Sequence, residues 1–479
     1  MANDTISLTL NPSSMEDYRT FIQSKQRKAR QFGFEWTCDN RKVFGWQKLV
    51  IEWAVRRGRA ALFEDCGLGK SSQQLLWADA IFRKTGGNVV IHCPVNVRLQ
   101  TKREAEKFGV KTPVNVVNTQ DEVKPGISLV NYEKLHHFDA STWMGVVLDE
   151  SSILKGFTGV TKRLLIELYS ETPYRLACTA TPAPNDHLEL GNHADFLGIM
   201  PSNEMISRWF INDTMKAGGY RLRRHGAEDF WKWVASWAVC IERPSDIGFD
   251  DRGYVLPELR EIVHIVEPEE REAPHGQLFC TDEITATSCH DEKRHSTPLR
   301  AEKVAELVAN EPGEPWLIWC DTNYEDEALR EAIPDAVVVR GSDQEDRKAN
   351  VLLAFSEGKI KRLITKPTIA GHGLNWQHCA RVAFVGLSFS YEEYYQAVRR
   401  TWRFGQQRPV NVHIVSTPQE ESIRKTVMEK QAAHAGMKRS MADAMREFSK
   451  SEIRQELVRE KYVPKLGIKL PAWMEAANG

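Results

Sequence analysis

The sequence lacks several features that would exclude whole classes of protein. It has no run of apolar residues near the length of about 20 that a bilayer-spanning helix needs. Residues 1–15 have no apolar core after a basic stretch, so they predict no secretory signal. We therefore expect a cytoplasmic protein without a membrane partner. The chain also has no excess of charge of one sign. Its 64 Lys and Arg residues nearly balance its 65 Asp and Glu residues, which leaves a net charge of -1. Any affinity for nucleic acid must then come from uneven placement of charge.

Closely spaced cysteine pairs are absent too, although the chain has nine cysteines. Cys93, Cys178 and Cys320 stand inside apolar runs, which is typical of reduced thiols packed as small hydrophobic groups. Four residues in one polar segment could suggest a zinc site: Cys280, Cys289, His290 and His295. Its spacing contains no Cys-x-x-Cys pair, which favours a solvated loop over a zinc site.

What the sequence does have is a repeated alternation of short apolar runs with polar, helix-favouring stretches. The runs are apolar on both faces, which predicts parallel strands covered by helices. In the first half they lie at residues 88–93, 127–131, 145–148 and 174–178. A second pattern has them at residues 316–320, 336–339, 362–365, 381–385 and 410–415. The fold class is therefore α/β, with two doubly wound parallel-sheet lobes in tandem.

Changes in composition suggest the domain boundaries. We predict an N-terminal arm at 1–32, a first lobe at 33–200, a helical insertion at 201–260, a linker at 261–297, a second lobe at 298–420 and a helical tail at 421–479.

The insertion is rich in aromatic residues: Trp209, Phe210, Phe230, Trp231, Trp233 and Trp237. Bases could stack on these rings beside Arg221, Arg223 and Arg224, but the helical spacing favours core packing. The charged tail either braces the second lobe or contacts a nucleic-acid backbone, and its mixed charge is typical of a solvated face.

A phosphate-binding loop is predicted at residues 60–72, where an apolar strand, a glycine turn and a helix start follow one another. Gly67, Leu68 and Gly69 let the backbone approach a polyphosphate, and the helix dipole favours an anion there. Lys70 adds positive charge, and Ser71 offers a hydroxyl to Mg²⁺. The alternative is a glycine turn with a surface lysine. Upstream, Gln47 could recognise an adenine edge or be an ordinary surface residue.

Polar side chains end two of the predicted strands. Asp149 and Glu150 follow a buried strand, where Asp149 can hold Mg²⁺ and Glu150 can polarise a water that attacks the γ-phosphate. Thr179 and Thr181 end another strand, and their hydroxyls can couple the acidic pair to the rest of the domain, although threonine is also common in turns.

Two arginines in the second half complete the predicted site. Arg400 and Arg403 project from one helix face, from which they could reach the γ-phosphate held by the first lobe. A surface helix with salt bridges is the alternative. The upstream phosphate loop favours the catalytic interpretation, in which such arginines stabilise charge in the transition state.

With these residues assembled, the chain resembles the superfamily-two helicases and, among them, the Swi/Snf-type DNA-dependent ATPases. Similar motifs occur in the same order: Trp46-Gln47, the loop from Glu64 to Ser71, Pro94 with Glu104, Lys107 and Phe108, Asn131-Tyr132-Glu133, Asp149-Glu150, Thr179 to Pro182, Gly371 to Asn375, and Gln396 through Arg400 and Arg403 to Gln406. They cover about residues 43–415.

The resemblance implies two RecA-like lobes that bind ATP and Mg²⁺ between them and move on a nucleic acid, most simply duplex DNA. It also implies that Gly373 and Gln396 belong to the nucleotide site. Ser151-Ser152 departs from the family's usual Ala-His or Gly-His, which affects coupling of hydrolysis to movement more than hydrolysis itself. The compact chain suggests a bacterial or phage member that works with replication, recombination or repair proteins.

Other functions remain open at this stage. One is a true strand-separating helicase acting on DNA or RNA. Another is a non-catalytic clamp, or the motor subunit of a restriction or defence complex whose partner supplies a nuclease. Intact Lys70, Glu150, Arg400 and Arg403 argue against a catalytically dead protein.

Overall fold

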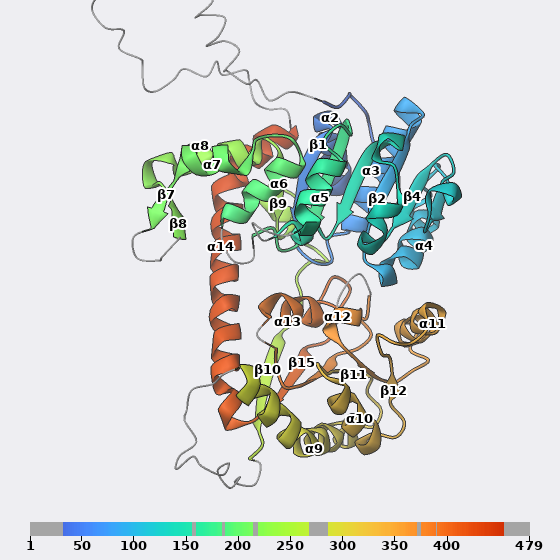
Figure 1. Cartoon of the computed structure of the whole chain (residues 1–479), viewed down its shortest axis with the longest axis vertical. Helices are drawn as coiled ribbons and strands as arrows, with labels where there is room; N and C mark the ends of the chain where they lie inside the picture. Colours follow the sequence, from blue (N-terminus) through green and yellow to red (C-terminus); the bar gives the residue numbers. More distant parts are fainter. Residues whose placement is uncertain are drawn as a thin grey trace, which may run out of the picture.

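The computed structural model describes residues 32–155, 160–183, 187–213, 219–267, 286–370, 375–388 and 390–454. Several features of the sequence lie outside these residues: most of the arm at 1–32, Cys280, the glycine turn with Gly373, and the tail beyond 454. Figure 1 shows two α/β lobes, one above the other, with the long helix α14 running beside both.

The first lobe is built on a seven-stranded sheet in the order β3-β4-β2-β5-β6-β1-β9. All neighbouring strands are parallel. The strands are β1 (Arg59–Glu64), β2 (Asn88–His92), β3 (Val114–Val116), β4 (Ile127–Val130), β5 (Trp143–Asp149), β6 (Tyr174–Thr179) and β9 (Ala238–Ile241). Strands β1, β5 and β6 are adjacent, so their carboxyl ends bring the phosphate loop, the acidic pair and the threonines to one edge.

Helices cover this sheet and bury its apolar residues in two clusters, one on each face. They are α2 (Gly45–Arg57), α3 (Lys70–Thr85), α4 (Arg98–Phe108), α5 (Val160–Leu168) and α6 (Leu190–Phe196). Because both faces are covered, the central strands carry the continuous apolar runs seen in the sequence.

The second lobe has a six-stranded parallel sheet in the order β10-β15-β14-β11-β13-β12. Its strands are β10 (Leu259–Ile265), β11 (Trp316–Trp319), β12 (Val337–Val338), β13 (Arg362–Thr365), β14 (Arg381–Val385) and β15 (Val410–Ser416). Its helices are α9 (Ala286–Asn310), α10 (Asn323–Ala332), α11 (Glu345–Ser356), α12 (Pro367–Ala370) and α13 (Tyr391–Val398). The predicted α/β class with two parallel-sheet lobes is confirmed.

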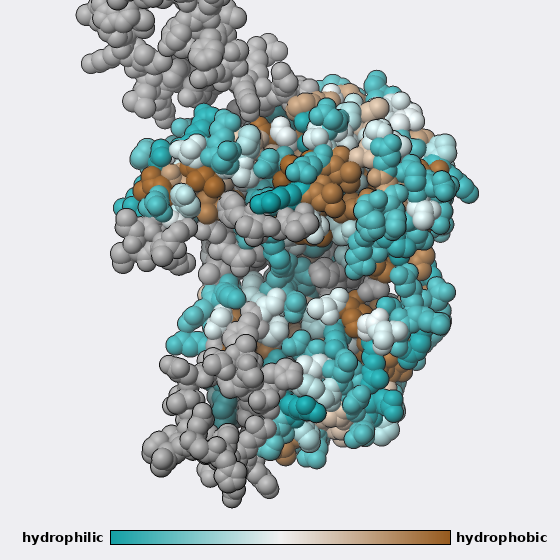
Figure 2. All heavy atoms as spheres, in the orientation of Figure 1, coloured by the Kyte–Doolittle hydropathy of each residue, from teal (hydrophilic) through white to brown (hydrophobic). Residues whose placement is uncertain are grey.

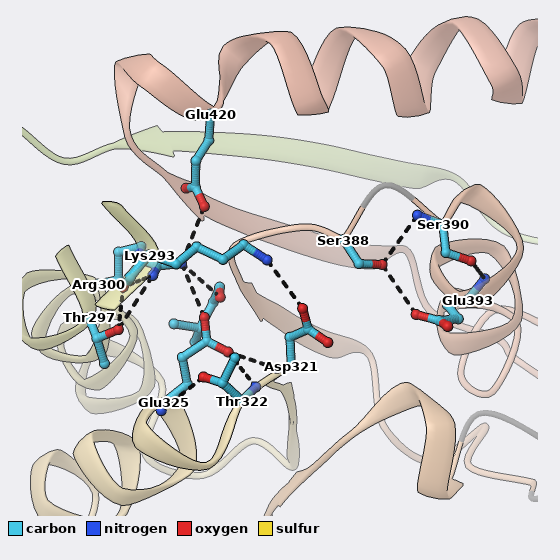
Figure 3. A network of polar contacts seen from close by, with 11 residues as sticks. Lys293, Thr297, Arg300, Asp321, Thr322, Glu325, Ser388, Ser390, Glu393 and Glu420 are labelled. Atoms are coloured by element: carbon cyan, nitrogen blue, oxygen red, sulfur yellow. Dashed lines mark hydrogen bonds and ion pairs between the residues drawn. The ribbon is translucent and has the colours of Figure 1, made fainter. Parts of the chain in front are cut away.

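A buried ionic network fixes the second lobe near the start of α14 (Figure 3). The Arg300 guanidinium is fully buried and lies 3.4 Å from Glu325 and 3.6 Å from Glu420. It also donates to the Val385 carbonyl oxygen at 3.0 Å. A buried charge is tolerated only when it is paired and hydrogen-bonded, so this arginine holds α9, α10 and the segment before α14 in one arrangement.

The predicted insertion forms a lateral extension of the first lobe (Figure 1). It contains α7 (Ser202–Trp209), α8 (Ala227–Ala235) and an antiparallel hairpin of β7 (Phe210–Asp213) with β8 (Gly219–Leu222). Its aromatic residues Trp209, Phe230, Trp231 and Trp237 are buried, which agrees with the core-packing interpretation. Hydrophobic atoms still reach the surface of this extension, beside hydrophilic ones (Figure 2).

Two predicted boundaries differ from the observed elements. Residues 238–241, placed in the insertion, form β9 and pair with β1 in the first sheet. Residues 259–265, placed at the insertion's end and in the linker, form β10 and pair with β15 in the second sheet. Both are edge strands. Strand β10 is partly exposed and mixed in composition, so it lacks the continuous apolar run of a central strand. Strand β9 is apolar and buried, but it follows the aromatic helix α8 so closely that it was assigned to the insertion.

Helix α14 (Glu421–Arg454) joins the cores of both lobes. Near its start, Ile423 and Val427 belong to the second lobe's apolar cluster. Further along, Met441 and Met445 belong to a first-lobe cluster. Of the two roles expected for the tail, bracing the second lobe agrees with the structure, and the helix contacts the first lobe as well. Contact with a nucleic-acid backbone stays a prediction. Within the described ranges, no helix combines the length and apolar character needed to cross a membrane.

Candidate nucleotide-binding site between the lobes

The phosphate loop connects β1 to α3 and requires glycine at two positions. Gly67 has φ of 92° and Gly69 has φ of 87°, a region that L side chains rarely adopt. There is also no room for a side chain at either position. A Cβ at Gly69 would lie 2.4 Å from Gln47 Nε2, and one at Gly67 would lie 2.9 Å from the Phe404 backbone nitrogen. The loop therefore lies in direct contact with α2 on one side and with the second lobe on the other.

Side chains around the loop hold its backbone. Lys70 Nζ donates to the carbonyl oxygens of Glu64 at 2.7 Å and Asp65 at 3.2 Å. Gln47 Nε2 donates to the Leu68 carbonyl oxygen at 2.7 Å. Ser71 lies in the first turn of α3 and is partly exposed. The expected role of Gln47 in adenine recognition stays a prediction, because here its amide group supports the loop itself.

The acidic pair lies at the end of β5, beside α3. Asp149 Oδ1 accepts from Gln74 Nε2 at 2.8 Å, and the Asp149 carbonyl oxygen accepts from the Tyr132 hydroxyl at 2.8 Å. Burial raises the pKa of Asp149 to about 6. Glu150 follows with φ of 72°, in the left-handed region. A cation near this pair would relieve the cost of burying the Asp149 carboxylate.

The paired threonines are hydrogen-bonded to the acidic pair. Thr179 Oγ1 donates to Glu150 Oε1. The Thr181 backbone N–H donates to Thr179 Oγ1 at 3.0 Å, and the two hydroxyl oxygens lie 3.5 Å apart. The end of β6 is thus hydrogen-bonded to the carboxylate of Glu150, and the coupling role of the threonines stays a prediction.

The two predicted arginines lie at the phosphate loop, although they come from the second lobe. A Cβ at Gly67 would lie 3.5 Å from Arg403 Cβ. Arg400 is buried, and its Nε donates to the carbonyl oxygen of Gln396, itself buried in α13, at 3.1 Å. Burial lowers the pKa of Arg400, while Glu150 and Asp149 act in the opposite direction. Burial also lowers the pKa of Arg403 to about 10, and the positive charge of Arg400 contributes.

Sequence reasoning missed a charged cluster on the loop itself. Asp65 Oδ2 lies 2.9 Å from Arg399 NH2, and its Oδ1 lies 3.1 Å from Lys438 Nζ of α14. Tyr395 also donates to Asp65. Burial alone would raise the pKa of Asp65, but Arg399 and Lys438 hold it below its ordinary value. Arg399 precedes Arg400, so the arginine motif did contain a signal for part of this cluster.

Three aromatic rings, also missed, lie beside the loop. Phe44 lies 5.8 Å from Tyr254 and 6.1 Å from Phe404, and the last two rings are 4.7 Å apart. They come from the start of α2, the segment before β10 and the arginine segment. Flat apolar surfaces of this kind suit a planar base next to a phosphate site.

The donor groups near the acidic pair fit Mg²⁺ chemically. Asp149 offers a carboxylate and Ser71 a hydroxyl, and Mg²⁺ prefers oxygen ligands together with substrate phosphates. The described residues contain no group of three or more His, Cys, Asp or Glu that could hold a metal ion by themselves. A site completed by phosphate oxygens agrees with both observations.

The chain is similar to a protein family, to a phage protein and to a solved structure. Residues 300–405, which include Arg400 and Arg403, match the family described as the helicase conserved C-terminal domain. A putative protein p41 of Acyrthosiphon pisum secondary endosymbiont phage 1 is 24% identical over 463 residues, covering 84% of this chain and 98% of that protein. A solved structure, the Sulfolobus solfataricus SWI2/SNF2 ATPase core in complex with dsDNA, covers 88% of this chain and 98% of its own, with 17% identity and a TM-score of 0.40.

The matched residues lie within the second of the two parallel-sheet lobes, and the motifs quoted above follow one another through both lobes. The match of residues 300–405 to the helicase conserved C-terminal domain supports the resemblance to the superfamily-two helicases that those motifs indicated.

Proposed function

We propose that the chain hydrolyses ATP between its two lobes and uses the resulting lobe movements to travel along or remodel duplex DNA. The observation that carries this proposal is the contact of the arginine segment with the phosphate loop, where Phe404 and Arg403 lie against Gly67. A triphosphate on the loop would therefore lie next to guanidinium groups from the other lobe.

Each group has a distinct chemical task. Lys70 binds the outer phosphates, and Glu150 accepts a hydrogen bond from the attacking water and draws off its proton. Arg400 and Arg403 offset the negative charge that develops on the transferred phosphoryl group. Ser71 and Asp149 would hold Mg²⁺, which when bound neutralises phosphate oxygens.

Ion pairs between the two lobes support coupling of this site to lobe movement. Arg98 lies 3.3 Å from Glu345, and Lys155 pairs with Glu392. Both pairs join an element of the first lobe to a helix of the second. Charge pairs of this kind form and break as lobes close and open, so ATP bound between the lobes would favour the closed arrangement.

A cavity of about 320 Å³ at the carboxyl edge of the second sheet suits a nucleic-acid backbone. Lys366, Arg340 and Ser342 are among its lining residues. Lysine, arginine and hydroxyl groups make most protein contacts to phosphate, without reading sequence. We assign the backbone contact of the second lobe to this cavity.

The ATPase stimulation profile tests the proposal. Purified chain would be assayed for phosphate release with duplex DNA, single-stranded DNA and RNA, beside an unwinding assay on forked DNA. We expect the strongest stimulation by duplex DNA, with no strand separation. Unwinding would favour the strand-separating helicase. Turnover that appears only after a second subunit is added would favour the motor subunit of a restriction or defence complex.

A further inference from the structure

The turn after the acidic pair is strained at the proposed catalytic residue. Glu150 is the one residue other than glycine with positive φ among those described. The left-handed conformation is unfavourable for an L residue with a side chain and persists only where the surroundings hold it. The contacts of this turn therefore decide where the Glu150 carboxylate lies.

Helix α6 holds both ends of that turn, the 3₁₀ segment Ser151–Leu154. At its start, Ser151 Oγ lies 3.1 Å from His193 Nε2. At its end, the Leu154 carbonyl oxygen accepts from Asn192 Nδ2 at 2.9 Å. Asn192 is fixed in turn by Lys162, whose Nζ donates to its Oδ1 at 2.9 Å. Two consecutive residues of α6 thus position the turn.

The direction of the Ser151 hydrogen bond follows from the second contact of the imidazole. His193 Nδ1 lies 3.3 Å from the Glu189 carbonyl oxygen, which can only accept, so Nδ1 carries the proton. His193 Nε2 is then an acceptor, and the Ser151 hydroxyl donates to it. Burial lowers the pKa of His193 to about 4, and its ring packs edge-on against Phe63 at 5.1 Å, so the ring is neutral and fixed.

This imidazole connects the turn to the region after β6. It reaches the turn from α6, and α6 follows the Thr179-Thr181 segment in the chain. Thr179 contacts the Glu150 carboxylate and His193 contacts the adjacent residue, so both contacts connect the acidic pair to the region after β6.

We infer that His193 is a positioning residue for Glu150, acting through the Ser151 hydroxyl, and that it links the acidic pair to α6. This inference rests on the proposed function. His193 touches neither substrate nor reacting atoms. Its hydrogen bond holds the strained turn so that the carboxylate points at the attacking water.

The test compares two substitutions of the same residue. His193→Phe keeps a ring that can pack on Phe63 but removes the acceptor, whereas His193→Gln keeps an acceptor near the position of Nε2. We expect His193→Phe to lower kcat for ATP hydrolysis about 10- to 100-fold, the loss typical of a small misplacement of a reacting group. KM for ATP and affinity for a fluorescent ATP analogue should change less than about twofold. His193→Gln should recover most of kcat.

Ser151→Ala removes the other partner of the same hydrogen bond. It also provides the test if the His193→Phe variant does not fold. It should match His193→Phe, and the double variant should be no worse than either single one. Ser152→Ala, at a neighbouring buried serine, is the control and should retain the wild-type kcat. An unchanged kcat in His193→Phe and Ser151→Ala would overturn this inference alone, as would a failure of His193→Gln to recover activity. A wild-type chain that hydrolyses no ATP would overturn the proposed function together with it.

Discussion

The two lobes contribute different ionisable groups to the site. The first lobe supplies carboxylates beside the cation Lys70, and burial raises the pKa of Asp149 to about 6. The second lobe supplies guanidinium groups, and burial lowers the pKa of Arg403 to about 10. Burial disfavours the charged form on both sides. Each lobe therefore holds charge that its own side does not fully compensate, and a polyphosphate with its cation, held between the lobes, would satisfy both.

The largest effect is expected on the first-lobe side of this comparison. Lys70→Ala removes the one side-chain cation of the phosphate loop, so both nucleotide affinity and hydrolysis should be lost. Equilibrium binding of a fluorescent ATP analogue and phosphate release would be measured on the same preparation. Tight binding by this variant would show that the loop is not the phosphate site.

Glu150→Gln should separate binding from chemistry. The amide keeps the shape of the side chain but cannot take a proton, so hydrolysis should fall by about 10²–10⁴ while ATP stays bound. Retention of ATP on a rapid spin column, beside steady-state turnover, checks both parts. Turnover at the wild-type rate would remove Glu150 from the mechanism.

A smaller effect is expected at the point where α14 meets the phosphate loop. Lys438→Met leaves Asp65 with one cation fewer, so the free energy of unfolding should fall by about 1.5–3 kcal/mol and KM for ATP should rise. Arg439→Met, at the next and exposed position, is the matched control and should change stability by less than about 0.5 kcal/mol. Equal effects of the two substitutions would show that the Lys438 contact with the loop has no specific role.

The parts of the fold predicted from the sequence are those fixed by local pattern. Apolar runs of five or so residues marked the central strands because both faces of each sheet are covered. The glycines of the phosphate loop and the acids after β5 could be found because their chemistry needs neighbours in the sequence. The edge strand β10 was missed because a half-exposed strand resembles any mixed segment. The edge strand β9 is apolar and buried, but it was grouped with the aromatic helix α8 that precedes it.

The contacts that hold the site could not be predicted from the sequence, for a different reason. The Ser151 hydroxyl and His193 are 42 positions apart, and Asp65 and Tyr395 are 330 positions apart. Nothing in the local pattern of any of these residues points to its partner. A buried histidine in a helix is most often a packed residue, and its role emerges only when the turn beside it is visible.

The account depends most on the approach of the second lobe's arginines to the first lobe's phosphate loop. The direct measurement is nucleic-acid-stimulated ATP hydrolysis by Arg403→Ala, with binding of a fluorescent ATP analogue followed in parallel. We predict a fall in kcat of about 10³-fold or more with ATP binding largely kept, because this side chain serves the transition state. Hydrolysis at the wild-type rate would contradict a site shared between the lobes.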